Sequence, residues 1–122
     1  MTFEKTYQIR PVPASRPKVP RYGHPYYPKR YTQFRKDWAL ITHNDWPMIY
    51  LETKDAREYE FSYEAWFDKH PVADIDNLFK ALTDTLVKAK VIPDDNLICR
   101  SYIDKHFHAG KEQVKITIRK IN

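Results

Sequence analysis

The chain has 122 residues, which is enough for one compact domain and too few for two. Hydrophobic residues make up 42% and can fill a core, whereas a charged fraction of 30% excludes a membrane-buried class. The sequence starts without the apolar run of a secretory signal, and its single cysteine excludes an internal disulfide. We therefore expect a cytoplasmic protein.

The net charge of +5 is distributed unevenly along the chain. Residues 1–36 contain nine Lys or Arg and one acidic residue, which gives +8, whereas residues 37–122 carry a net charge of −3. A basic arm beside a mildly acidic body suits a protein that holds phosphate groups at one place and metal ions at another.

The first third of the chain combines a predicted strand with a proline-rich segment. Residues 2–10 alternate between apolar and polar side chains, which indicates a half-buried strand. Six of the nine prolines lie within residues 11–28, so this segment is expected to be extended and at the surface. Its cations alternate with aromatic residues, a pattern that suits phosphates and unpaired bases, although a stiffened loop with solvated charges has the same pattern. The cations that we expect to contact DNA are Arg16, Lys18, Arg21, Lys29, Arg30, Arg35 and Lys36.

The remaining periodicity predicts two helices and four further strands. Residues 28–43 and 76–90 have apolar side chains at helical spacing. The first apolar stripe contains Tyr31, Phe34, Trp38 and Ile41, and the second contains Ile75, Leu78, Phe79, Leu82 and Leu86. Residues 48–53 and 58–67 are predicted strands, and residues 97–107 and 114–121 a predicted antiparallel pair. The fold class is therefore α+β, with a mixed or antiparallel sheet of four to five strands packed on two helices.

The densest chemical signal is a group of acidic residues at the start of the second helix. Asp74 and Asp76 flank Ile75, so their carboxylates point to the same side of an extended chain. Asp76, Lys80 and Asp84 follow at spacings of four, which places them on one helix face.

Oxygen ligands of this kind suit Mg²⁺, which is usually bound by one or two carboxylates and completes its shell with water and phosphate oxygens. The later pair Asp94 and Asp95 could add to such a site. Helix capping, a surface ion pair and ordinary turn chemistry explain the same residues without a metal. The spacing alone leaves both interpretations open.

Together these residues resemble the signature of the RusA family of Holliday junction resolvases. The matching positions are Asp74, Asp76, Asn77, Lys80, Asp84, Asp94 and Asp95, and the likeness extends over nearly the whole chain as a single RusA-like endonuclease domain, residues 1–122, with the basic segment 11–30 within it. The resemblance implies a homodimer that binds four-way or branched DNA and makes paired symmetric nicks with Mg²⁺, for which Mn²⁺ can substitute. It also fits a phage or prophage origin in a bacterial cell.

The resemblance also assigns roles to individual residues. It implies that Asp74, Asp76 and Asp95 are the essential, metal-binding carboxylates and that Lys80 is the catalytic lysine. Asn77, Asp84 and Asp94 fall on supporting positions. The sequence departs from the family at Val72 and Ala73, where relatives often carry Arg or Pro, so an accessory cation is either missing or supplied elsewhere, for example by Lys69.

Two alternative functions remain open. One is a non-catalytic nucleic-acid-binding module, because ferredoxin-like RNA-binding domains have a related order of strands and helices. The strand that should stack on bases carries Glu58, Glu60 and Glu64, which would repel phosphates. The other is a nuclease with the same chemistry that acts on flaps, forks or RNA.

Overall fold

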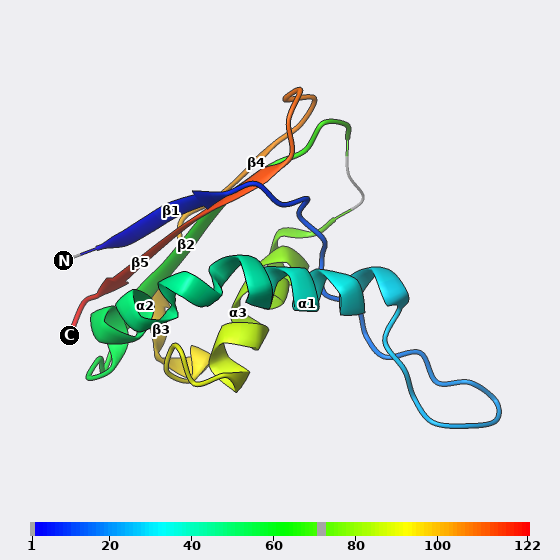
Figure 1. Cartoon of the computed structure of the whole chain (residues 1–122), viewed down its shortest axis with the longest axis horizontal. Coiled ribbons are helices and arrows are strands. Elements are labelled where there is room, and N and C mark those ends of the chain that lie inside the picture. The colour runs from blue at the N-terminus through cyan, green and yellow to red at the C-terminus, as the bar shows by residue number, and fades with distance from the viewer. Residues whose placement is uncertain (1, 71–72) are drawn as a thin grey trace.

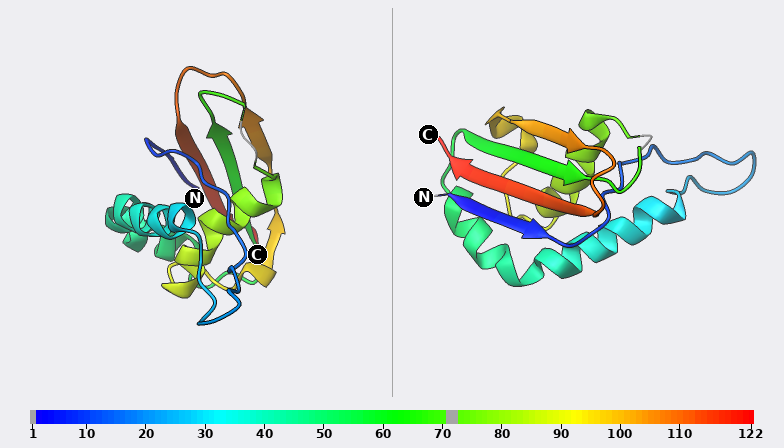
Figure 2. Two further views of the ribbon diagram at one scale, coloured as in Figure 1. Left: turned by 90° about the vertical axis from the view of Figure 1, so that its right-hand side faces the viewer. Right: turned by 90° about the horizontal axis from the view of Figure 1, so that it is seen from above.

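The computed structural model describes residues 2–70 and 73–122 and contains a mixed five-stranded sheet with helices packed on one face (Figures 1 and 2). This arrangement confirms the predicted α+β class. The elements in chain order are β1 (Phe3–Tyr7), α1 (Lys29–Thr42), the 3₁₀ turn η1 (His43–Asp45), α2 (Trp46–Thr53), β2 (Tyr59–Trp66), α3 (Ile75–Lys88), the 3₁₀ turn η2 (Asp95–Leu97), β3 (Ile98–Arg100), β4 (Ile103–His106) and β5 (Gln113–Lys120). Within the described residues, no helix is long and apolar enough to span a membrane.

Strand β2 is the central strand of the sheet, and it corrects the predicted pairing of the last strands. Strand β5 runs antiparallel to both β1 and β2, whereas β3 and β4 run parallel to β2 on its other side. The predicted antiparallel pair of residues 97–107 and 114–121 is therefore wrong, because β2 lies between β4 and β5. Helix α3 supplies the crossover that a parallel connection from β2 requires.

The predicted strand at residues 48–53 is also wrong, because these residues belong to helix α2. Pro47 lies in the first turn, a position that tolerates proline. Ile49 and Thr53 are buried one turn apart, while Met48 and Leu51 are exposed. A short apolar run has no clear period, so the sequence did not distinguish a buried strand from a helix here.

The core forms between the inner face of the sheet and the helices. Tyr59, Phe61 and Tyr63 of β2 are almost fully buried, as the alternation in the sequence predicts. Ile116 and Ile118 of β5 lie beside them in register, with Phe61 opposite Ile118 and Tyr63 opposite Ile116. These side chains form the apolar layer on which the three helices pack.

Trp38 connects the two long helices. Its side chain is fully buried, and its indole N–H donates to the carbonyl oxygen of Leu82 in α3 at 3.0 Å. The predicted stripes are confirmed except at their ends, because Ile41 is 37% exposed and Ile75 is 48% exposed. Thr42 takes the buried position at the end of α1, where its hydroxyl donates to the carbonyl oxygen of Trp38.

A polar contact attaches β1 to the end of the helical layer. The Asp45 carboxylate accepts hydrogen bonds from Lys5 Nζ at 2.9 Å and from the Tyr7 hydroxyl at 2.7 Å. Burial alone would raise the pKa of Asp45, but the hydrogen bonds from Lys5 and Tyr7 and the Lys5 charge lower it below its ordinary value of 3.8. Only the ionised carboxylate is fully stabilised by these partners.

Replacing Asp45 by Asn is expected to destabilise the fold by about 1–2 kcal/mol at neutral pH, because a charge-assisted pair of hydrogen bonds is weakened. The folded-state pKa is depressed, so this contribution is present above pH 3.8 and disappears as the pH falls through the lower folded-state value. Urea unfolding at pH 7 and at pH 3 measures this contribution to the free energy of unfolding. The difference between parent and D45N should shrink at the lower pH, and an equal difference at both values would contradict the assignment.

Candidate active site

Asp74 and Asp76 lie at the N-terminal end of α3. Asp74 is the residue before the helix and is still extended, with φ −80° and ψ 148°, and Asp76 lies in the first turn. Both side chains are exposed. Asp76 Oδ1 accepts a hydrogen bond from the backbone N–H of Asn77 at 3.0 Å, and its negative charge lies at the positive end of the helix dipole.

The central strand holds this helix start in place. The hydroxyl of Tyr63 donates to the carbonyl oxygen of Ile75 at 2.6 Å, which fixes the peptide between the two aspartates to β2. Burial, and after it the nearby Asp76 charge, raises the pKa of Tyr63 well above its usual range. The tyrosine therefore stays a neutral hydrogen-bond donor at physiological pH.

Lys80, Asp84 and the turn η2 meet beyond the first turn of α3. The pKa of Asp95 is raised by partial burial, by a hydrogen bond with Asp94 and by the charges of Asp94 and Asp84, and it is lowered by the charge of Lys80. These four charged groups are therefore close enough to interact. Asp84 also lies close to α1. The pKa of Tyr31 in that helix is raised first by the burial of the tyrosine and second by the charge of Asp84.

The turn that carries Asp95 is fixed by its own capping and by β2. Asp94 accepts a hydrogen bond from the backbone N–H of Asn96 at 3.0 Å and caps the 3₁₀ turn. The hydroxyl of Tyr59 donates to the carbonyl oxygen of Pro93 at 2.8 Å. Two tyrosines of one strand, Tyr59 and Tyr63, thus position the two segments that carry the acidic residues.

The donor set fits a hard divalent cation. All of its candidate ligands are carboxylates, and Asp95 is repelled by the neighbouring Asp94 and Asp84, a repulsion that a bound cation would relieve. Within residues 2–70 and 73–122, no three acidic, histidine or cysteine side chains are gathered closely enough to hold a metal ion as they stand. Asp74, Asp76 and Asp95 are exposed, so their side chains can reorient toward an ion.

Two backbone anchors next to the aspartates connect other segments to the site. The backbone N–H of Ala14 donates to the carbonyl oxygen of Asn77 at 2.8 Å, so the proline-rich segment is attached to α3. Lys105 Nζ donates to the carbonyl oxygen of Ala73 at 2.6 Å and ties the residue before Asp74 to β4. Sequence reasoning missed Lys105, and no signal in the sequence singled it out, because its contact with Ala73 depends on the pairing of β4 with β2.

The predicted DNA-binding cations lie on a protruding loop and on the first half of α1 (Figure 1). The loop, residues 15–27, is closed by reciprocal backbone hydrogen bonds between Lys18 and Tyr26 and contains no regular element, as the prolines predict. Arg35 lies over the rings of Tyr27 and Tyr31, 5.4 and 5.6 Å from their centroids. The exposed members of the set are Arg16, Lys18, Arg21, Lys29, Arg30 and Lys36.

Comparison with known proteins identifies the family of this chain. The model of the family Endodeoxyribonuclease RusA matches residues 8–119. The chain belongs to the RusA family. A RusA relative, the crossover junction endodeoxyribonuclease RusA of Aquifex aeolicus (strain VF5), is 35% identical over 112 residues, which cover 89% of this chain and 84% of the relative. The match confirms the resemblance inferred from the sequence and spans the basic loop and both acidic segments.

The sequence departs from the RusA pattern at Val72 and Ala73, and the structure describes the second of these positions. Val72 lies outside the described residues. Ala73 is half-buried, and its neighbourhood includes Lys69, Arg10 and Arg30 as well as Lys105. Lys105 therefore supplies a cation from another segment at the position where the RusA resemblance leads one to expect a cation in the chain itself.

Proposed function

We propose that this RusA-family endodeoxyribonuclease resolves Holliday junctions and related branched DNA by paired symmetric nicks, as a homodimer in DNA recombination and repair. The observation that carries the proposal is that Asp94 and Asp95 of the turn η2 lie close enough to interact with Lys80 and Asp84, which share the α3 face that begins at Asp76. The name of the Aquifex aeolicus relative, crossover junction endodeoxyribonuclease, supports a junction as the substrate. A two-fold symmetric substrate requires two copies of a chain that has one such site.

In this proposal Asp74, Asp76 and Asp95 hold Mg²⁺, and Mn²⁺ can substitute. A divalent ion held there would lower the pKa of a water and would stabilise negative charge on phosphodiester oxygens. Lys80 places its ammonium group where charge develops on the cleaved phosphate. Asp94 positions Asp95 by capping the turn, and Asp84 balances Lys80 from the next helical turn.

The basic loop and α1 would guide the DNA to this site. Arg16, Lys18 and Arg21 on the loop contact backbone phosphates, and Lys29, Arg30, Arg35 and Lys36 extend the same basic surface along the helix. Because Ala14 is hydrogen-bonded to Asn77, DNA that is held by the loop lies next to the carboxylates. Such a substrate supports a location in the cytoplasm of a bacterial cell, and a phage or prophage origin stays a prediction.

A cleavage assay with four-way, forked, flapped and linear duplex DNA, and with single-stranded RNA, tests this function. We expect paired nicks at symmetric positions across a four-way junction in Mg²⁺ and no nicks in EDTA. Denaturing gels with each strand labelled in turn map the cuts. Preferential cutting of forks, flaps or RNA would support the proposed metal-dependent hydrolysis but contradict a four-way junction as the substrate. Binding without metal-dependent cutting would overturn the whole proposal.

A further inference from the structure

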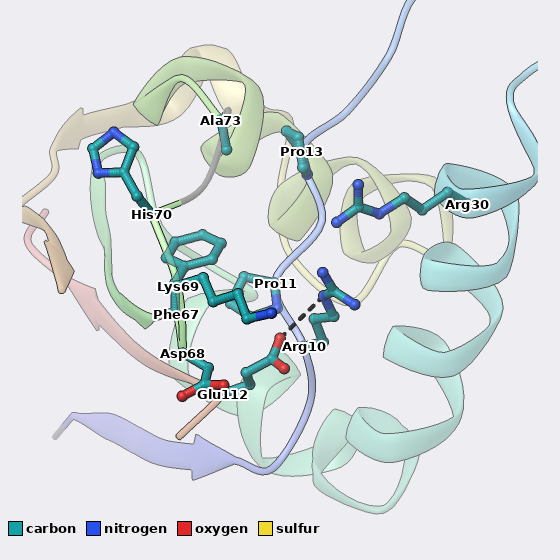
Figure 3. A pocket seen from close by; sticks show the side chains of 10 residues that line it. All are labelled: Arg10, Pro11, Pro13, Arg30, Phe67, Asp68, Lys69, His70, Ala73 and Glu112. Carbon is teal, nitrogen blue, oxygen red and sulfur yellow. Dashed lines mark ion pairs between the residues drawn. The ribbon is translucent and has the colours of Figure 1, made fainter. Parts of the chain in front are cut away.

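A pocket with a volume of about 450 Å³ lies beside the candidate active site (Figure 3). Four segments that are distant in sequence enclose it: the start of the proline-rich segment, the first turn of α1, the loop after β2, and Glu112 just before β5. The first three each contribute one cation, namely Arg10, Arg30 and Lys69. Ala73, the residue directly before Asp74, is also part of the lining.

The wall of the pocket is apolar and firmly attached to the sheet. Phe67 is buried, its backbone N–H donates to the carbonyl oxygen of His106, and its carbonyl oxygen accepts from Ala109. Pro11 and Pro13 also line the pocket, and Pro11 is buried. The cations therefore project from a wall with restricted backbone freedom.

The charge of the pocket is net positive. Arg10 pairs with Glu112 at 3.0 Å, but both side chains are partly exposed, and a pair of this kind contributes little to stability. Asp68 is the other acidic residue of the lining. In the part of the chain that the structure describes, neither Arg30 nor Lys69 forms an ion pair. An anion that enters can therefore be contacted by all three cations at a small cost in broken pairs.

The position of the pocket indicates what this anion is. Ala73 connects it directly to Asp74, and Lys105 holds the Ala73 carbonyl in place. Arg30 belongs to both the pocket and the basic surface of α1. A DNA strand that crosses the carboxylates from the basic loop would therefore bring a second phosphate to the pocket.

We propose that Arg10, Arg30 and Lys69 form a phosphate-binding pocket for the substrate DNA strand, next to the phosphate that is cleaved. This inference rests on the proposed function and assigns two cations, Arg10 and Lys69, to DNA binding. Glu112 limits the affinity of the pocket for DNA, because its carboxylate competes with the phosphate for Arg10.

Two substitutions with opposite charge effects test the pocket. Lys69→Gln removes a cation, so binding of a four-way junction in EDTA should weaken about three- to tenfold, and the slope of log K against log salt should fall by about one. Glu112→Gln removes the competing carboxylate, and binding should tighten by about the same factor. Lys54→Gln is the control, because Lys54 is an exposed lysine directly after α2 and outside the pocket. Fluorescence anisotropy over a salt series measures all four proteins, and their melting temperatures check that each is folded.

Binding of linear duplex in the same series separates the two proposals. If the parent cuts no branched DNA but the two variants still shift duplex binding in opposite directions, the pocket is supported and the proposed function fails. If the parent resolves junctions while K69Q and E112Q bind DNA as K54Q does, the pocket inference is wrong. Weakening by E112Q would also overturn it, because it would indicate that the Arg10–Glu112 pair holds the pocket together and does not compete with DNA.

Discussion

Replacing Asp76 by Asn is expected to slow cleavage of a four-way junction by about three orders of magnitude while the affinity for the junction is retained. The amide keeps the shape of the side chain but removes the charge that a Mg²⁺ ligand needs. Its oxygen can still accept the hydrogen bond from the Asn77 backbone N–H, so the start of α3 should be preserved. Single-turnover cleavage in Mg²⁺ and junction binding in EDTA measure the two effects separately.

Asp37→Asn is the matched control for this experiment. Asp37 is also an exposed helical aspartate with one hydrogen bond, which it accepts from Gln33 at 2.9 Å, but it lies on α1 away from the acidic group. D37N should cut at the parent rate. If D76N also nicks the junction at that rate, Asp76 is only a helix-capping charge and the active-site assignment falls.

Much of the candidate site could be predicted because helical spacing alone brings its residues together. Asp76, Lys80 and Asp84 share a face whenever residues 76–84 form a helix, and the apolar stripe of α3 made that helix easy to predict. The approach of Asp95 to Lys80 and Asp84 depends instead on how the chain turns after α3. Lys90 has a positive φ of 59°, and the buried Val91 and Ile92 turn the chain back toward the sheet. Spacing carries no signal for that turn. The residues alone offered Asp94 and Asp95 as a pair that could add to the site, and the family resemblance singled out Asp95 as a ligand.

The rest of the fold could not be predicted where local pattern and tertiary packing disagree. The central position of β2 depends on which strands pair with its two edges, a long-range choice that alternation within one strand does not determine. Lys105 illustrates the same limit in the site. A lysine at the end of a strand is usually solvated, and its contact with Ala73 exists only because β4 lies parallel to β2, beside the start of α3.

Replacing Asp95 by Asn is expected to abolish cleavage and, in the absence of metal, to raise the melting temperature by about 2–4 °C. Asp94 and Asp84 both act on the Asp95 carboxylate, and burial and this repulsion raise its pKa. The charge of ionised Asp95 is therefore opposed by its neighbours until a cation is bound, and the neutral amide removes this repulsion. Because Asp95 is exposed to solvent, which screens the charges, the effect on stability is small. Thermal unfolding in EDTA and in Mg²⁺, combined with the junction assay, measures both effects.

Lys80→Met is expected to change the melting temperature in the opposite direction from D95N. Lys80 offsets the negative charge around Asp95, so its loss should lower the melting temperature in EDTA, where D95N raises it. Mg²⁺ should stabilise the parent more than D95N, because only the parent keeps the full set of carboxylates. If D95N instead melts below the parent in EDTA, the carboxylate is a structural part of its turn, as its position directly after Asp94 would also allow. If the melting temperature in EDTA rises in D95N and falls in K80M, the acidic residues around Asp95 reduce the stability of the metal-free protein, and their place in the site is explained by function.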